Sequence, residues 1–192
     1  MSTTINTFGI VGDPVEILNW RRFDGRLTTS GQPTEEQLGA IKELGVTNIV
    51  NLGLHNHEKA LPDESATVST LGMRYIHIPV DFASPTEKDF DRFRETMHLT
   101  RHEQTHVHCI INARVSAFMC RYQRDVLGID PYEAYSAMET IWRPGGSWAE
   151  FLGKLNTLTC PIGTQVGITD GRCLANVCHC FLATLLIQPC LL

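Results

Sequence analysis

The stretch that decides the fold is Val107-His108-Cys109-Ile110-Ile111-Asn112-Ala113-Arg114-Val115-Ser116-Ala117-Phe118. It begins as the end of a predicted β-strand at residues 105–109, passes through a short loop and continues as a helix with apolar residues at helical spacing. A cysteine in this position lies where loop N–H groups and the positive end of the helix can hold an anion over the sulfur. The context therefore predicts a functional cysteine rather than a structural one.

Cys109 and Arg114 are the residues of this stretch that we expect to act chemically. The electrostatic field that holds an anion also favours thiolate over thiol, which makes Cys109 a candidate nucleophile. Arg114 can offer its planar guanidinium to two oxygens of an oxyanion. For Cys120, on the following helix, we expect an ordinary buried position.

Strand-like and helix-like segments alternate on both sides of the cysteine. Buried or alternating apolar residues predict strands at residues 47–52 and 75–80, and residues 26–30 predict a short edge strand. Capping residues predict helix starts at residues 34, 85–86, 130 and 147, and Gly128 is expected to end the helix that follows Cys109. This order predicts an α/β domain with a central, largely parallel sheet of about four to five strands flanked by helices. The loops after Leu52, after Val80 and at Cys109 should then converge at one edge of the sheet.

Composition is consistent with one globular domain. The chain has 192 residues, of which 43% are hydrophobic and 19% charged, so it is neither disordered nor fibrous. A net charge of −5 without a basic run argues against nucleic acid or an anionic membrane as the main partner. We expect the domain at residues 18–158, after an N-terminal extension at residues 1–17.

Residues 159–192 form a tail with a different composition. Five of the seven cysteines lie there, and from residue 161 onward only Asp170 and Arg172 are charged. This Cys-rich, apolar tail could bind a metal, dock a hydrophobic partner or be a non-native C-terminus without defined structure. Its longest apolar stretch, residues 180–192, is shorter than the roughly 20 residues that span a bilayer. Residues 1–16 do not resemble a secretory signal, so we expect a cytoplasmic location.

Several of these segments resemble the cysteine-dependent protein phosphatases. The likeness is to the small bacterial dual-specificity and tyrosine-type branch, which includes the phosphatase-like domain found with beta-lactamase-like hydrolases. It spans about residues 18–158 and rests on residues 27–33, residues 45–52, residues 78–81 with Pro85, and the His108-Cys109 loop. The resemblance implies hydrolysis of a phosphomonoester through a phosphocysteine, without a metal or organic cofactor. The implied substrate is a phosphorylated protein or small molecule.

The resemblance also implies roles for individual residues. Cys109 would be the nucleophile, Arg114 the phosphate clamp and Asp81 the acid that protonates the leaving group. His108 would orient the loop, and Ser116 would help the thiolate to leave. The remaining substrate-binding loop positions would be Ile110, Ile111, Asn112, Ala113 and Val115.

The loop departs from the family pattern in its spacing. The family has five residues between the cysteine and the arginine, whereas four residues separate Cys109 from Arg114, and Val115 stands at the expected arginine position. Asn112 stands where the phosphatases usually have glycine. Four intervening residues are closer to the loop of rhodanese sulfurtransferases. Two alternatives therefore remain open: a sulfurtransferase or persulfide carrier that uses Cys109, and an inactive module that binds phosphorylated ligands.

The histidine pairs of the chain do not predict a metal site. His55 and His57 lie in an expected loop, and His106 and His108 alternate along a strand. Neither pair has a further ligand at the spacing that a zinc site needs. We expect substrate-facing or hydrogen-bonded roles for His55 and His57, and a packed role for His106.

Overall fold

The computed structural model describes residues 12–153 of the chain. Their helices and strands are, in chain order, β1 (Arg21–Arg22), β2 (Leu27–Ser30), α1 (Glu35–Glu43), β3 (Asn48–Asn51), α2 (Glu64–Thr70), β4 (Arg74–His77), α3 (Glu87–Leu99), β5 (Thr105–His108), α4 (Ala113–Asp125), α5 (Pro131–Glu139) and α6 (Ser147–Leu152). The predicted Cys-rich tail at residues 159–192 lies outside the described residues, as do residues 1–11 of the predicted N-terminal extension.

The strands form a single sheet in the order β1-β2-β5-β3-β4. The four strands from β2 to β4 in this order are parallel, and β1 is antiparallel to β2. The predicted α/β fold with a largely parallel sheet of four to five strands is therefore confirmed. The predicted strand at residues 26–30 is present as β2, but its predicted edge position is wrong, because the two-residue strand β1 pairs with its outer side.

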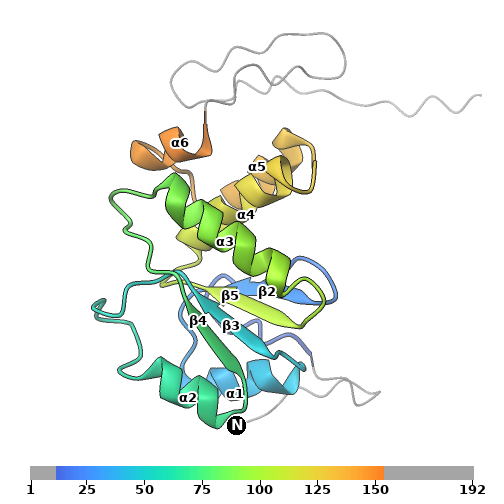
Figure 1. The fold of residues 1–192 in the computed structure, drawn as a ribbon, viewed down its shortest axis with the longest axis vertical. Helices are drawn as coiled ribbons and strands as arrows, with labels where there is room; N and C mark the ends of the chain where they lie inside the picture. The colour runs from blue at the N-terminus through green and yellow to red at the C-terminus, as the bar shows by residue number, and fades with distance from the viewer. Residues whose placement is uncertain (1–11, 154–192) are drawn as a thin grey trace, which may run out of the picture. The chain divides into compact units, whose positions relative to one another are not determined.

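The helices cover both faces of the sheet (Figure 1). On one face, α1 and α2 pack over a cluster that includes Leu38, Ile49 and Val68. On the other face, α3, α4, α5 and α6 pack over a larger cluster, whose aromatic members include Phe93 and Phe118. Successive side chains of a strand point to opposite faces of the sheet. Ile49 and Val50 on β3 therefore belong to different clusters.

Capping chemistry explains where most helices begin. Thr34 with Gln37 and Thr86 with Asp89 form the capping boxes of α1 and α3. Asp130 accepts from the first backbone N–H groups of α5. These predicted starts are confirmed. The predicted capping box at residue 147 is wrong, because Gly146 occupies the cap position and Ser147 is already helical.

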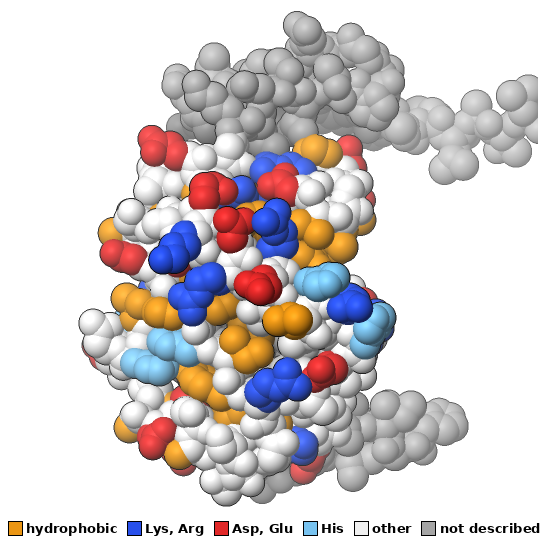
Figure 2. All heavy atoms as spheres, viewed as in Figure 1, with side chains coloured by type: hydrophobic (Ala, Val, Ile, Leu, Met, Phe, Trp, Pro, Cys, Tyr) orange, Lys and Arg blue, Asp and Glu red, His pale blue; other side chains and the backbone are white. Residues whose placement is uncertain are grey.

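The outer surface of the described residues carries mixed charge. Over α3, acidic and basic side chains are interspersed (Figure 2), and Arg121 pairs with Glu87 at 2.7 Å. Within residues 12–153, none of the helices combines the length and the apolar character that crossing a membrane requires.

Candidate functional site

Cys109 lies at the carboxyl edge of the sheet, directly after the central strand β5, and is 1% exposed. Its N–H donates to the carbonyl of Ser30 on β2 at 3.4 Å. On the other side of β5, the N–H of Leu52 donates to the carbonyl of His108 at 2.8 Å. Neighbouring strands therefore fix the position of the cysteine from both sides.

The loop after Cys109 leads directly into α4 and leaves a row of free donors. Among the described residues, the backbone N–H groups of residues 110–115 donate to no hydrogen bond. Asn112 makes the turn into α4 with a left-handed φ of 68°, a conformation that asparagine tolerates better than most residues. Unpaired N–H groups at the start of a 13-residue helix, close to a cysteine, are suited to an anion.

Two carbonyl groups of the loop are bound from outside, which orients its peptide planes. The Gln32 N–H donates to the Ile110 carbonyl at 3.1 Å, and the Asn19 side chain donates to the Ile111 carbonyl at 2.9 Å. In a trans peptide the N–H points away from the carbonyl, so the next N–H in each case points away from this outer layer. Asn112 completes the attachment by donating from Nδ2 to the Asn19 carbonyl at 2.7 Å.

Gly31 permits this close packing behind the loop. A Cβ atom at this position would lie 3.0 Å from the Ile110 carbonyl oxygen and 3.1 Å from that of Leu18. Both contacts are to backbone, which cannot move aside cheaply. A side chain at residue 31 would therefore displace the loop that begins at Cys109.

Arg114 is a buried cation without a described anionic partner. It lies in the first turn of α4 and is 6% exposed. Its guanidinium carbon lies 5.4 Å from the centre of the Phe82 ring, and its Nε atom has no hydrogen-bond partner among residues 12–153. A buried charge is costly unless it is paired. An oxyanion bound at the loop would supply the missing charge and acceptors.

Phe82 belongs to an aromatic cluster that the sequence analysis did not single out. Its ring lies 5.6 Å from that of Trp142 and 5.5 Å from that of Trp148, and the Trp148 Nε1–H donates to the Phe82 carbonyl at 2.7 Å. This cluster holds the segment after β4 against the segment before α6. Asp81 directly precedes Phe82, whose ring contacts Arg114.

Asp81 itself is exposed and stabilises the turn that it begins. Its Oδ1 atom accepts from the N–H of Ala83 at 2.9 Å. No hydrogen bond joins it to Cys109 or Arg114 among the described residues. The role of Asp81 as the acid therefore remains a prediction.

Ser116 and Val115 are also buried in α4. The Ser116 hydroxyl donates to the Ala113 carbonyl at 2.9 Å and accepts from Trp142 Nε1 at 3.1 Å. Val115 points into the large core cluster, so only its backbone N–H is available to a ligand. Ile111 is the exposed member of the loop, at 43%.

His108 is buried against a carboxylate on α2. Its Nε2 atom lies 2.8 Å from Oε1 of Glu64, close enough for an ion pair although the angle is poor for a hydrogen bond. Burial raises the pKa of Glu64, but the charge and contact of His108, together with hydrogen bonds from Gln32 and Tyr75, outweigh it and leave the pKa below its usual value. Glu64 is therefore a buried carboxylate that is ionised at neutral pH.

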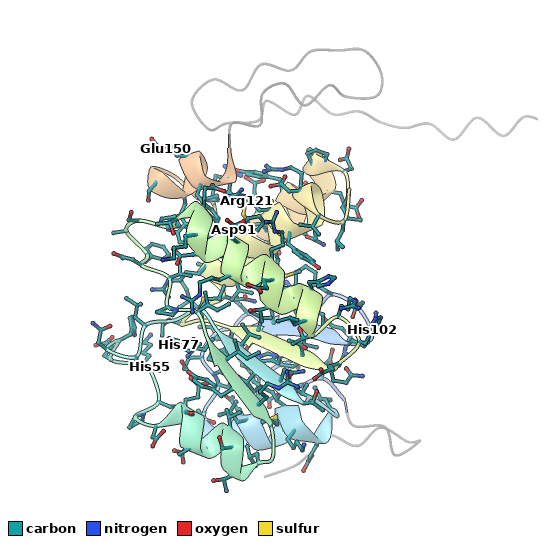
Figure 3. All side chains as sticks on the ribbon, viewed as in Figure 1. His55, His77, Asp91, His102, Arg121 and Glu150 are labelled. Carbon is teal, nitrogen blue, oxygen red and sulfur yellow. The ribbon has the colours of Figure 1, made fainter. Side chains whose placement is uncertain are left out.

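A histidine pair lies at the outer end of this network. His55 and His77 stack with their ring centres 3.8 Å apart and lie side by side in Figure 3. His55 Nε2 is 2.9 Å from the Tyr75 hydroxyl, which donates to Glu64 at 3.3 Å. The hydrogen-bonded position expected for His55 is thus present. Within residues 12–153, no three His, Cys, Asp or Glu side chains gather to hold a metal ion.

The other predicted histidine and cysteine positions are as expected. His106 is fully buried, stacked on Trp20 and bonded to Thr28 and Ser30. Cys120 is buried, and burial raises the pKa of its thiol to about 11.

Sequence comparisons leave the chain without an assigned relative. No protein-family model matches it, and no curated protein matches it significantly. Comparison with solved structures is informative. A DUF442 protein from Shewanella putrefaciens CN-32, assigned as a phosphatase, is 28% identical over 71% of this chain and 89% of its own, with a TM-score of 0.63.

Two more distant structures share the fold. A cysteine-to-serine variant of TpbA from P. aeruginosa, in complex with phosphotyrosine, is 18% identical over 76% of this chain and 88% of its own, with a TM-score of 0.60. A kinase associated phosphatase whose catalytic cysteine is replaced by serine is 13% identical over 67% of this chain and 84% of its own, with a TM-score of 0.60.

Proposed function

We propose that this chain, which resembles the cysteine-dependent phosphatases in its fold and in its strand–cysteine–helix motif, hydrolyses phosphomonoesters through Cys109. The observation that carries the proposal is the combination of free loop N–H groups with a buried, unpartnered guanidinium at Arg114. Both features suit a dianionic oxyanion beside the cysteine. The substrate class is a phosphorylated protein or small molecule.

The proposed reaction has two displacement steps. The Cys109 thiolate attacks phosphorus, a P–S bond forms, and the P–O bond to the leaving alcohol or phenol breaks. Asp81, as the general acid, transfers a proton to the leaving oxygen and becomes a carboxylate. Water then gives a proton to the Asp81 carboxylate and attacks phosphorus, the P–S bond breaks, and inorganic phosphate and the Cys109 thiolate are released. Throughout, the N–H groups of residues 110–115 and Arg114 hold the three equatorial oxygens.

The test compares two cysteine variants on an aryl phosphate. Cys109→Ser should lower turnover by on the order of 10³-fold or more, because a neutral hydroxyl is a much weaker nucleophile than a thiolate. Cys120→Ser, a matched change in the next helix, should retain turnover because its thiol is buried and protonated. Wild-type turnover in Cys109→Ser would refute the covalent mechanism.

The short spacing between Cys109 and Arg114 favours testing a second function, sulfur transfer. A persulfide sulfur needs fewer hydrogen-bond donors than a phosphoryl group with three equatorial oxygens. Thiocyanate formation from thiosulfate and cyanide that depends on Cys109, without phosphate release, would replace the phosphatase by a sulfurtransferase. Inactivity in both assays with retained vanadate binding would indicate a phospho-ligand-binding module.

A further inference from the structure

Glu64 is unusual among the acidic residues of the described chain because it is 3% exposed. A buried carboxylate is retained only when it is paired and hydrogen-bonded. Asn51 Nδ2 donates to its Oε2 at 2.8 Å, and Tyr75 donates to the same oxygen at 3.3 Å. Gln32 Nε2 donates to Oε1 at 3.4 Å, and His108 Nε2 lies 2.8 Å from Oε1.

These four partners come from the four parallel strands of the sheet. Asn51 and His108 are the last residues of β3 and β5, Tyr75 lies in β4, and Gln32 follows β2 by two positions. Glu64, on α2, therefore contacts the last residues of β3 and β5, where the Cys109 loop starts, and also binds β4 and the segment that follows β2. Two of its partners are connected to the loop directly: His108 precedes Cys109, and the Gln32 N–H binds the Ile110 carbonyl.

Asn51 extends the same connection to the loop after β3. Its Oδ1 atom accepts from the Gly53 N–H at 2.6 Å, while its Nδ2 atom binds Glu64. A Cβ atom on Gly53 would lie 3.4 Å from the Ile110 side chain, so this second loop lies against the first. The Glu64 carboxylate is therefore linked to the Cys109 loop by two routes, one through Gln32 and one through Asn51 and Gly53.

We infer that Glu64 is a positioning residue, whose carboxylate holds the ends of β3 and β5 and the segment after β2 so that the Cys109 loop keeps the shape of an anion site. The inference deepens the proposed function and rests on it. Glu64 touches neither the cysteine nor a substrate, and it acts through His108, Gln32 and Asn51.

The test measures the anion site without relying on turnover. Cys109 is alkylated with iodoacetate, an anion, and separately with iodoacetamide, its neutral analogue. The ratio of the two rates reports anion binding at the loop, because the amount of thiolate cancels. Trypsin releases residues 102–114, in which Cys109 is the sole cysteine, so mass spectrometry follows this thiol alone.

Glu64→Gln keeps the size of the side chain but replaces one acceptor by a donor that faces other donors. We expect the iodoacetate preference at Cys109 to fall by about tenfold or more, the range seen when an outer supporting group is removed. Glu103→Gln is the matched control. Glu103 accepts a hydrogen bond from Asn48 at 2.8 Å, at the end of β3 opposite to Asn51. Its replacement should leave the iodoacetate preference at Cys109 unchanged.

Each outcome bears on the inference. A preference in Glu64→Gln equal to that of the wild type would overturn it, as would an equal loss in Glu103→Gln. If Glu64→Gln does not fold, Glu64→Asp replaces it, and a wild-type preference in this shortened variant would also overturn the inference. A wild-type protein without any preference for iodoacetate would refute the proposed anion site itself, and the inference with it.

Discussion

At the scale of single residues, Arg114 is expected to lower the free energy of unfolding while it serves the proposed anion site. Arg114 is buried with its Nε atom unpaired in the described structure, and its guanidinium carbon lies over the Phe82 ring. Desolvating an unpaired guanidinium destabilises the folded state, and an apolar side chain of similar length would avoid that cost. Function and stability should therefore respond to substitution here in opposite directions.

Arg114→Met tests this opposition. We expect the free energy of unfolding in urea to rise by about 1 kcal/mol, because methionine fills the space without a buried charge. Hydrolysis of an aryl phosphate should fall by on the order of 10²–10³-fold, because oxyanion donors are lost. A variant that is less stable than the wild type would show that Arg114 is paired in solution.

Some residues of the candidate site can be predicted from the sequence, and others cannot. Cys109 and Arg114 stand out because a cysteine at a strand end before a helix has a recognisable context. The burial of Glu64 cannot be predicted from the sequence, because glutamate is almost always exposed and the residues next to Glu64 in the chain do not indicate burial. Phe82 and Trp142 read as ordinary aromatic residues, and only the tertiary structure brings them to the site.

At the scale of elements, side-chain capping separates two helices that look alike in sequence. Thr86 accepts from the Asp89 N–H at 3.2 Å in a complete capping box, whereas Ser147 is the first helical residue of α6 and caps nothing. Thr86→Ala should lower the free energy of unfolding by about 1 kcal/mol. Ser147→Ala should change the free energy of unfolding by only about a few tenths of a kcal/mol. Equal losses in urea denaturation would contradict the assignment of Gly146 as the cap.

The predicted elements are those with strong local signals. Helices α1, α3 and α5 have both caps and apolar spacing, and β3 is a short buried strand between Gly45 and Gly53. Helix α2 is missing from the prediction because its buried residues are Val68 and Glu64, which make no apolar stripe. Strand β1 is missing because it has two exposed arginines and exists only through its pairing with β2.

At the scale of the whole molecule, buried histidine makes stability depend on pH. Complete burial, with the charge of His108, holds the pKa of His106 well below its usual value. As the pH falls below about 6.5, the unfolded chain binds a proton at this residue that the folded chain does not. The free energy of unfolding should therefore decrease by up to about 1.4 kcal/mol per pH unit from this residue.

Urea denaturation between pH 8 and pH 5 measures this effect. His106→Gln should show a shallower pH dependence than the wild type, because it has no imidazole to protonate. His77, whose pKa burial also lowers, acts in the same direction and is present in both proteins. An unchanged pH dependence in His106→Gln would show that His106 is not the group responsible.

Strand order is the whole-molecule property that the sequence analysis did not specify. Parallel pairing follows from the alternation of strands and helices, but local sequence does not say which strand lies beside which. β5 is the last strand in the described residues, yet it lies at the centre of the sheet, between β2 and β3.

The central place of β5 also makes the shape of the Cys109 loop depend on strand pairing between distant parts of the chain. Thr28 and His106, which face each other across β2 and β5, stand 78 residues apart, so a long loop must close before they pair. Until that closure, the Cys109 N–H lacks the Ser30 carbonyl on β2 to which it donates. The proposed anion site beside Cys109 therefore forms only together with the sheet, and the unfolded chain presents Cys109 without that site.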